Sequence, residues 1–255
     1  MTVINTNTGS IYAQQALIAN SRGLDRTMQQ LSTGKRINNS VDDVAGMAIA
    51  TRLSAQIRGL NQAVRNANDG ISMIQTAEGA TEQITNMLQR MRELAVQASN
   101  DTNNTDDRSF LDLEFRALNA QINNIARFTQ WNAADILDGP QRDLGSGVFS
   151  FQVGANASQT IEVTFPDLRT ESGSLLQAIR PATIADTLRA NTALGIISTA
   201  FDLVNLERAK MGAVISRLQF AADNLFNVSA KASESRSRIE DTDYSMATTD
   251  LARRN

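Results

Sequence analysis

The fold is decided by residues 57–98, which read IRGLNQAVRNANDGISMIQTAEGATEQITNMLQRMRELAVQA. Mostly apolar residues return every seven positions through about 40 residues without a proline, the pattern of a long helix that lies against another. The row consists of Leu60, Ala67, Ile74, Thr81, Leu88 and Ala95, of which only Thr81 is polar. A companion row starts three residues before each anchor and later follows three residues after it, because a 3.6-residue helix drifts against a seven-residue repeat. We therefore predict one helix whose seam rotates slowly along its length.

Such a helix would be roughly 60 Å long, so it needs an equally long partner. The partner is predicted at residues 194–225, where a second row has a single charged interruption at Arg208. This row consists of Ile197, Val204, Met211, Leu218 and Leu225. We expect the two segments to run antiparallel, because the chain must return along the first helix. The predicted fold class is mainly α, an elongated antiparallel helical bundle, or rod, with a small β-hairpin region.

Composition excludes several classes of function. The 255 residues carry a net charge of −3 with a pI near 5.1, so the composition gives no sign of the basic surface that nucleic acid requires. The chain has no cysteine and no histidine, which removes the usual nucleophile and base pairs and most transition-metal sites. We expect no enzyme activity, no cofactor and no metal site. No apolar run approaches the 18 residues of a membrane span, so none is predicted.

The N-terminal region predicts another helix, which begins near Ser10 and ends at Gly34. Its apolar row consists of Leu17, Leu24, Met28 and Leu31. Gly34 suits the left-handed residue that closes a helix, and Lys35 and Arg36 would then face the negative end of that helix. Ser40 or Asp42 is the expected N-cap of the long helix, with Asp43 in its first turn.

After the long helix, the polar run at 100–107 predicts a loop, and a shorter third helix follows. Its shared apolar face consists of Leu111, Phe115, Leu118, Ile122 and Ile125. Apolar and polar residues then alternate at 149–153 and 161–165 around the turn-rich residues 154–158, which predicts a β-hairpin. The last helix is expected to begin at Pro181 or Thr183.

Six stretches resemble bacterial flagellin, the subunit of the flagellar filament. They are INTN at 4–7, QLSTGKRIN at 30–38, DDVAG at 42–46, LQRMRELAVQ at 88–97, FQVGAN at 151–156 and SRIEDTDY at 237–244. Hook-filament junction proteins share the stretch around Gly34 and the long-helix architecture. Flagellin is preferred because the stretches at 88–97 and 151–156 are not expected together in a junction protein.

The resemblance implies a domain organisation and a function. Residues 1–42 would form an N-terminal filament-core helix, and residues 43–180 the long helix, second helix and hairpin of the rod. Residues 181–235 would form the C-terminal rod helix, and 236–255 the start of a truncated core segment. The implied protein is exported without a cleaved signal peptide and builds an extracellular filament for swimming. Its implied partners are other flagellin subunits, the export apparatus and the cap and junction proteins.

Two departures from the family pattern bear on assembly. Flagellins usually carry a further apolar helix after the stretch that matches residues 250–252, and this sequence stops at Asn255. We therefore expect the row of Leu17, Leu24, Met28 and Leu31, the assembly residues that the resemblance implies, to lack its partner. Flagellins also often carry variable outer domains after the hairpin, and this chain has almost none.

The resemblance also implies a surface that a vertebrate toll-like receptor recognises, formed by Gln89, Arg90, Glu93, Leu94 and Glu114. The alternative is a solvated helix face, and either interpretation expects Arg90 and Leu94 to be exposed. A surface adhesin that binds a polysaccharide is a further alternative function, although aromatic residues for a glycan platform are few. The acidic pairs at 42–43 and 240–241 are interpreted as helix caps and solvated ends rather than calcium sites.

Overall fold

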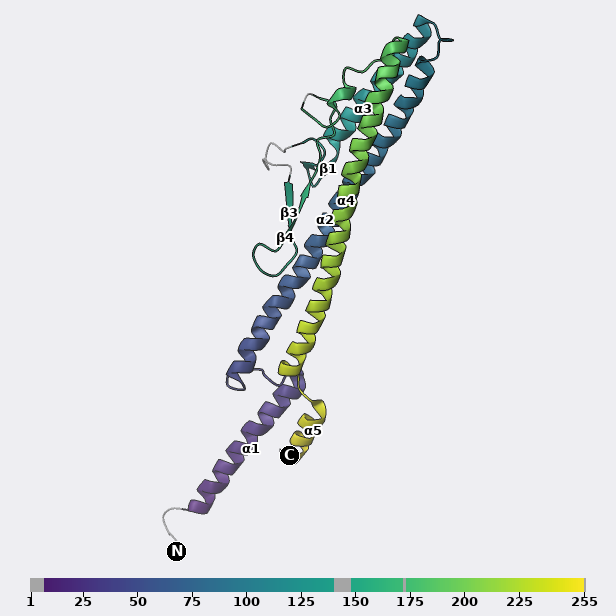
Figure 1. Ribbon diagram of the computed structural model, residues 1–255. Helices are drawn as coiled ribbons and strands as arrows, with labels where there is room; N and C mark the ends of the chain where they lie inside the picture. Colours follow the sequence, from purple (N-terminus) through teal and green to yellow (C-terminus); the bar gives the residue numbers. More distant parts are fainter. Residues whose placement is uncertain (1–6, 140–147, 172, 255) are drawn as a thin grey trace. The chain divides into compact units, whose positions relative to one another are not determined.

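The computed structural model describes residues 7–139, 148–171 and 173–254, so residues 4–6 of the first flagellin-like stretch lie outside the described part. Helices dominate it (Figure 1): α1 (Thr8–Thr33), α2 (Val44–Ala98), α3 (Thr105–Phe128), the 3₁₀ turn η1 (Gln177–Ile179), α4 (Thr187–Glu240) and α5 (Tyr244–Arg254). The strands are β1 (Gln130–Trp131), β2 (Ala134–Asp135), β3 (Val148–Gln152) and β4 (Thr160–Thr164). The predicted class, mainly α with a small hairpin, is confirmed. The helix expected to end near residue 235 continues to Glu240.

The chain forms two compact units. Unit 1 consists of Met1–Asn61 with Phe226–Asn255, and unit 2 consists of Gln62–Leu225. Both long helices contribute to each unit, because α2 and α4 run through both boundaries. The hairpins and α3 belong to unit 2, whereas α1 and α5 belong to unit 1.

The packing of α2 against α4 follows the seven-residue rows. The anchors of both rows, including the eight residues predicted as the rod core, are all buried: Leu60, Ala67, Ile74, Leu88 and Ala95 on α2, and Ile197, Val204, Met211, Leu218 and Leu225 on α4. Thr81 is also buried, and its hydroxyl donates to the carbonyl of Glu78 at 2.8 Å. The polar step in the row therefore finds its partner within its own helix.

Contacts between the two helices show that they run antiparallel. In unit 2, Arg208 Nη2 lies 3.8 Å from Glu78 Oε1. In unit 1, Ser229 donates to Asn61 at 2.8 Å, and Arg236 donates to Ser54 at 3.2 Å. Earlier residues of α2 thus meet later residues of α4, and the predicted direction is confirmed.

The third helix, α3, completes the core of unit 2. Phe115 and Ile122 are fully buried, and the other three residues of the predicted face pack against the same core. A capping box starts the helix: Asp107 N–H donates to Asn104 Oδ1 at 2.8 Å, and Asn104 N–H donates to Asp107 Oδ2 at 3.2 Å.

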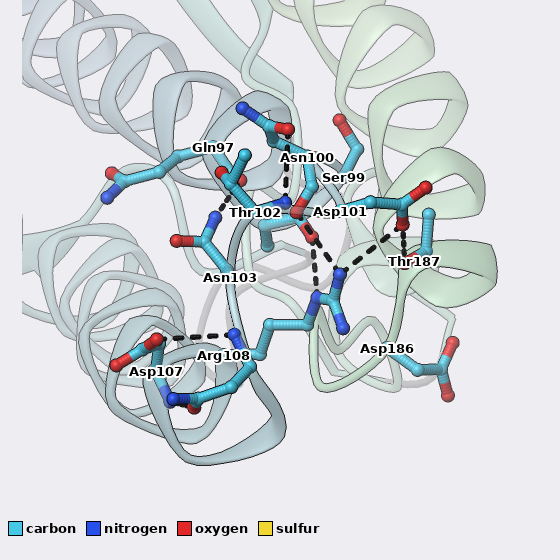
Figure 2. A network of polar contacts seen from close by, with 12 residues as sticks. Gln97, Ser99, Asn100, Asp101, Thr102, Asn103, Asp107, Arg108, Asp186 and Thr187 are labelled. Atoms are coloured by element: carbon cyan, nitrogen blue, oxygen red, sulfur yellow. Dashed lines mark hydrogen bonds and ion pairs between the residues drawn. The ribbon is translucent and has the colours of Figure 1, made fainter.

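Arg108 fixes the connection from α2 to α3, as Figure 2 shows. Its guanidinium donates to the carbonyls of Ala98 at 2.9 Å and Asn100 at 3.1 Å, next to the end of α2, where a cation is favoured. It also lies 3.6 Å from Asp101, which accepts a hydrogen bond of 3.4 Å from Thr187 at the start of α4. Arg108 of α3 therefore holds the end of α2 and the loop directly, and Asp101 of that loop connects them to the start of α4.

The predicted β-hairpin is present as β3 and β4, with Phe149 opposite Val163 and Phe151 opposite Ile161. It lies against α2 of the same unit, where Asn66 donates to the carbonyl of Gln152 at 3.1 Å. Gly70 of α2 permits the close approach, because a Cβ atom there would lie 3.1 Å from the Phe151 ring and 3.3 Å from Leu218. The packing of the hairpin thus favours glycine at this point of the helix, because a larger residue would displace Phe151 or Leu218.

The start of α4 was predicted too early. The helix begins at Thr187 rather than at Pro181 or Thr183, with Asp186 as its N-cap, accepting from Arg189 N–H at 2.8 Å. The preceding residues are held by the buried carboxylate of Asp112, which accepts from the Thr183 hydroxyl at 2.6 Å and from Ile184 N–H at 2.9 Å. These bonds hold the segment in an irregular path and delay the helix.

A small structure between α3 and β3 was not predicted. Strands β1 and β2 form a tight hairpin, whose turn residues Asn132 and Ala133 have φ of 48° and 64°. Beyond these strands in the sequence, Arg169 pairs with Asp167 at 2.7 Å and with Asp138 at 2.9 Å. Hydrogen bonds to Asp167 raise the pKa of Arg169, and burial raises the pKa of Asp138 despite the guanidinium. The pair joins the segments on either side of the main hairpin.

In unit 1, Gly34 ends α1 as predicted, with φ of 71° and its N–H donating to Gln30 at 2.9 Å. Two details differ from the prediction. Asp43, rather than Ser40 or Asp42, caps α2 by accepting from Gly46 N–H at 2.9 Å. Asp42 accepts instead from the N–H groups of Asn39 and Asn38, which lower its pKa, and it pairs with Arg26 at 2.7 Å.

Lys35 and Arg36 were predicted to face the end of α1. They face the end of α4 instead. Lys35 Nζ lies 2.6 Å from Glu240, and the Arg36 guanidinium donates to the carbonyl of Ile239 at 2.7 Å. The left-handed turn at Gly34 redirects the chain, so both cations meet the carboxyl end of another helix in the same unit.

Candidate assembly and recognition surfaces

The apolar row of α1 divides into a covered and an uncovered part. Leu24 and Leu31 are half-buried, whereas Leu17 is 70% exposed and Met28 is 54% exposed. Helix α5 lies along the later part of α1: the Tyr244 hydroxyl donates to the carbonyl of Leu31 at 3.0 Å, and the Asn20 amide donates to the carbonyl of Arg254 at 2.8 Å. The expectation that the row has no partner is therefore wrong for this part of α1.

The first half of α1 carries apolar side chains that nothing in the described chain covers. Every residue at positions 8–22 is exposed, including Ile11, Leu17 and Ile18. Exposed apolar residues that recur along one helix are typical of a surface that associates with another molecule. This row, together with Met28, is the candidate assembly surface.

The candidate recognition surface lies where α2 faces α3. Arg90 is half-exposed and reaches Glu114 of α3 at 2.8 Å and Glu93 of its own helix at 3.0 Å. Hydrogen bonds to Glu114, and then to Glu93, raise the pKa of Arg90. Gln89 and Glu93 are exposed beside it. The structure thus brings four of the five predicted residues, Gln89, Arg90, Glu93 and Glu114, together on one face.

Leu94 does not belong to that face. Its side chain is 1% exposed and forms part of the core of unit 2. It lies one helical turn after Arg90 on α2, but its side chain is enclosed by the core while the longer arginine reaches the surface. The expectation that Leu94 is exposed is wrong.

The sequence interpretation missed a groove next to the recognition surface. It lies between α2 and α4 and is lined by Gln89, Arg92, Glu93, Val96, Gln97, Phe201 and Asn205. Val96 is 54% exposed, an apolar residue outside both rows of the seam. The position of Val96 outside the seven-residue pattern was the one sequence feature that could have indicated this groove.

Two kinds of feature are absent from the part of the chain that the structure describes. Among residues 7–139, 148–171 and 173–254, no three His, Cys, Asp or Glu side chains are grouped so that they could hold a metal ion. Within the same part of the chain, no helix combines the length and the apolar character needed to span a membrane.

Comparison with known proteins identifies the family of the chain. Residues 4–142 match the bacterial flagellin N-terminal helical region, and residues 194–255 match the bacterial flagellin C-terminal helical region. The chain belongs to the bacterial flagellin family. Flagellins are structural proteins of the bacterial flagellar filament, so this flagellin is a filament subunit and not an enzyme.

Individual relatives agree with the family match. A flagellin of Halalkalibacterium halodurans is 38% identical over 99% of this chain and 90% of its own length. A flagellar filament 30.7 kDa core protein of Treponema maltophilum is 32% identical over 98% of this chain and 90% of its own length. The crystal structure of Bacillus cereus flagellin matches 63% of this chain and 88% of its own, with 30% identity and a TM-score of 0.55.

The different burial of Arg90 and Leu94 gives a direct prediction. Leu94→Ala should lower the free energy of unfolding by about 2–5 kcal/mol, because it leaves a cavity in the core. Arg90→Ala, a change at a half-exposed position, should alter it far less, because surface ion pairs contribute little to stability. Denaturant unfolding followed by circular dichroism measures both. Equal stability of the two variants would contradict the burial of Leu94.

Proposed function

We propose that this flagellin joins other subunits through the uncovered apolar row of α1. The observation that carries the proposal is the exposure of Ile11, Leu17 and Ile18 in the first half of α1, where every described residue from 8 to 22 is exposed. Covering such a row with the same kind of row from neighbouring copies removes apolar surface from water. Contacts of this kind that do not close on themselves produce an open helical assembly, which is the form of a filament.

The family match supports two further parts of the proposal. The subunit reaches the cell exterior through the flagellar export apparatus, and it meets cap and junction proteins at the ends of the filament.

The assembly role is tested with Leu17→Asp in a bacterium that has this chain as its only flagellin. A carboxylate buried without a partner in a subunit contact is strongly unfavourable, so the variant should form few or short filaments and swim poorly. Leu188→Asp is the matched control, because Leu188 is 79% exposed at the start of α4, outside α1.

Electron microscopy of filaments and a swimming assay supply the readouts. Circular dichroism of the purified variants should show unchanged helix content, because both leucines are exposed in the isolated chain. Filaments of normal length and number in the Leu17→Asp strain would contradict the assembly role of α1.

A second proposed role is recognition by a vertebrate toll-like receptor through Gln89, Arg90, Glu93 and Glu114. Its support is the placement of Arg90 between carboxylates from two helices, half-exposed, where a partner can reach the guanidinium and both acids. The ion pairs also restrain the arginine side chain before binding, which lowers the entropy lost when a partner orders it. Leu94 is not included, because it lies in the core.

The recognition role predicts that Arg90→Ala weakens signalling in a cell reporter assay by about thirtyfold, the effect of losing an arginine near the centre of an interface. Arg217→Ala is the control, since Arg217 is an exposed arginine of α4. Unchanged potency of Arg90→Ala would favour the solvated-face interpretation of this surface.

A further inference from the structure

The first turns of α3 expose apolar side chains on the outside of unit 2. Phe110 is 67% exposed and Leu113 is 65% exposed, although the same helix buries Phe115 in the core. Leu113 lies two residues before Phe115, and successive residues of a helix are turned by about 100°, so Leu113 is on the far side of α3 from the core. Asp106, one turn before Phe110, is exposed on the same side. We call Asp106, Phe110 and Leu113 the α3 outer face.

The groove between α2 and α4 lies on the opposite side of the same unit. Its volume is about 800 Å³, and its apolar lining consists of Val96, which is exposed, and Phe201, which is half-buried. In a bundle of three helices, the outer side of one helix faces away from the groove that the other two form. Because α3 is the third helix of unit 2, its outer face and the groove point in roughly opposite directions. Each copy of the chain therefore carries two surfaces that cannot contact each other within one molecule.

The charges beside these apolar residues are opposite in sign. Among the described residues that line the groove, the cation is Arg92 and the acid is Glu93, which already pairs with Arg90 at 3.0 Å. Arg92 is exposed at the edge of the groove. The acid of the α3 outer face is Asp106, whereas its neighbour Asp107 is used by the capping box. The groove thus presents a cation next to apolar side chains, and the α3 outer face presents an acid next to apolar side chains.

We propose that the α3 outer face of one subunit packs into the α2–α4 groove of the next subunit in the filament. A second copy is the occupant that fits, because filament subunits contact copies of themselves. The contact buries the apolar residues of both surfaces and brings the opposite charges of Asp106 and Arg92 to one interface. Because the two surfaces differ and lie on opposite sides of the unit, the contact repeats from copy to copy without closing. It rests on the filament role of the family and is separate from the α1 row, which belongs to unit 1.

Cross-linking between copies tests the contact. The chain has no cysteine, so a bacterium that makes Val96→Cys and Leu113→Cys chains as its only flagellins builds filaments with one cysteine per chain. Any covalent dimer must then join two copies. A flexible bis-maleimide should link the two kinds of chain in these mixed filaments, and filaments of either variant alone should give no dimers. Phe128→Cys replaces Leu113→Cys in the control: Phe128 is 72% exposed on the same helix but about four turns away, so it should not link to position 96.

A charge exchange tests the polar part of the contact. Arg92→Glu and Asp106→Lys each place like charges opposite each other, so each should lower the temperature at which sheared filaments dissociate. The chain with both changes should regain the wild-type temperature, because the charges are again opposite. A defect at the start of α3 would not be rescued by a change on α2. Arg217→Glu is the control, since Arg217 is an exposed arginine of α4 outside the groove.

Two results would overturn the proposal. One is mixed filaments of normal length that yield no dimers between positions 96 and 113, which would leave the groove to another partner. The other is dimers in filaments of Leu113→Cys alone, which would show that two α3 outer faces meet each other. Either result is obtained on assembled filaments, so it leaves the proposed role of α1 intact. The Leu17→Asp strain tests that role separately.

Discussion

The apolar seam between α2 and α4 is the interaction on which the other features depend. Each large residue of its rows contributes about 1.5–3 kcal/mol by leaving water, and the two rows supply such residues in both units. Ala67 and Ala95 bury less area, but they allow the facing helix to approach closely. The seven-residue spacing keeps the two helices in contact over many turns, which neither helix would maintain alone.

The remaining elements of unit 2 attach to this seam at places where a specific residue permits it. Gly70 leaves room for Phe151 of the hairpin, and Arg108 closes the turn into α3. Asp112 holds the segment before α4 by accepting hydrogen bonds from Thr183 and Ile184. In unit 1, backbone hydrogen bonds between residues 34–36 and 240–242 bring the ends of α1 and α4 together. The assembly surface on α1 is thus presented by a helix whose end is fixed.

The sequence predicted features that depend on periodicity. The seam, the buried face of α3 and the hairpin at β3 and β4 are repeated patterns that reflect one buried side, so they could be found without coordinates. Features that depend on distant partners could not be found. Lys35 and Arg36 were assigned to the nearer helix end, because the sequence does not show that the end of α4 lies beside them. Asp43 was one of several adjacent residues able to cap α2, and only the backbone path selects it.

The candidate recognition surface was likewise predicted only in part. A resemblance of motif identifies which residues are shared, but it does not show which of them are buried. Arg90 and Leu94 are one helical turn apart on α2, yet the long arginine reaches the surface and Glu114 while the leucine lies in the core. The prediction that the α1 row lacks a partner was wrong for the later part of α1, for a related reason. A polar, 11-residue segment gives a weak helical pattern, and its packing on α1 depends on contacts between residues far apart in the sequence.

The central claim, the antiparallel register of α2 and α4, is tested most directly by paired cysteines in this cysteine-free chain. Asn61 and Ser229 are in contact at 2.8 Å, so Asn61→Cys with Ser229→Cys should form an intramolecular cross-link on oxidation or with a short thiol reagent. Ser54→Cys with Ser229→Cys tests a register displaced by seven residues, because Ser54 meets Arg236 instead. The account predicts efficient cross-linking of the first pair and none of the second. Equal cross-linking of both pairs, or cross-linking of the displaced pair alone, would contradict it.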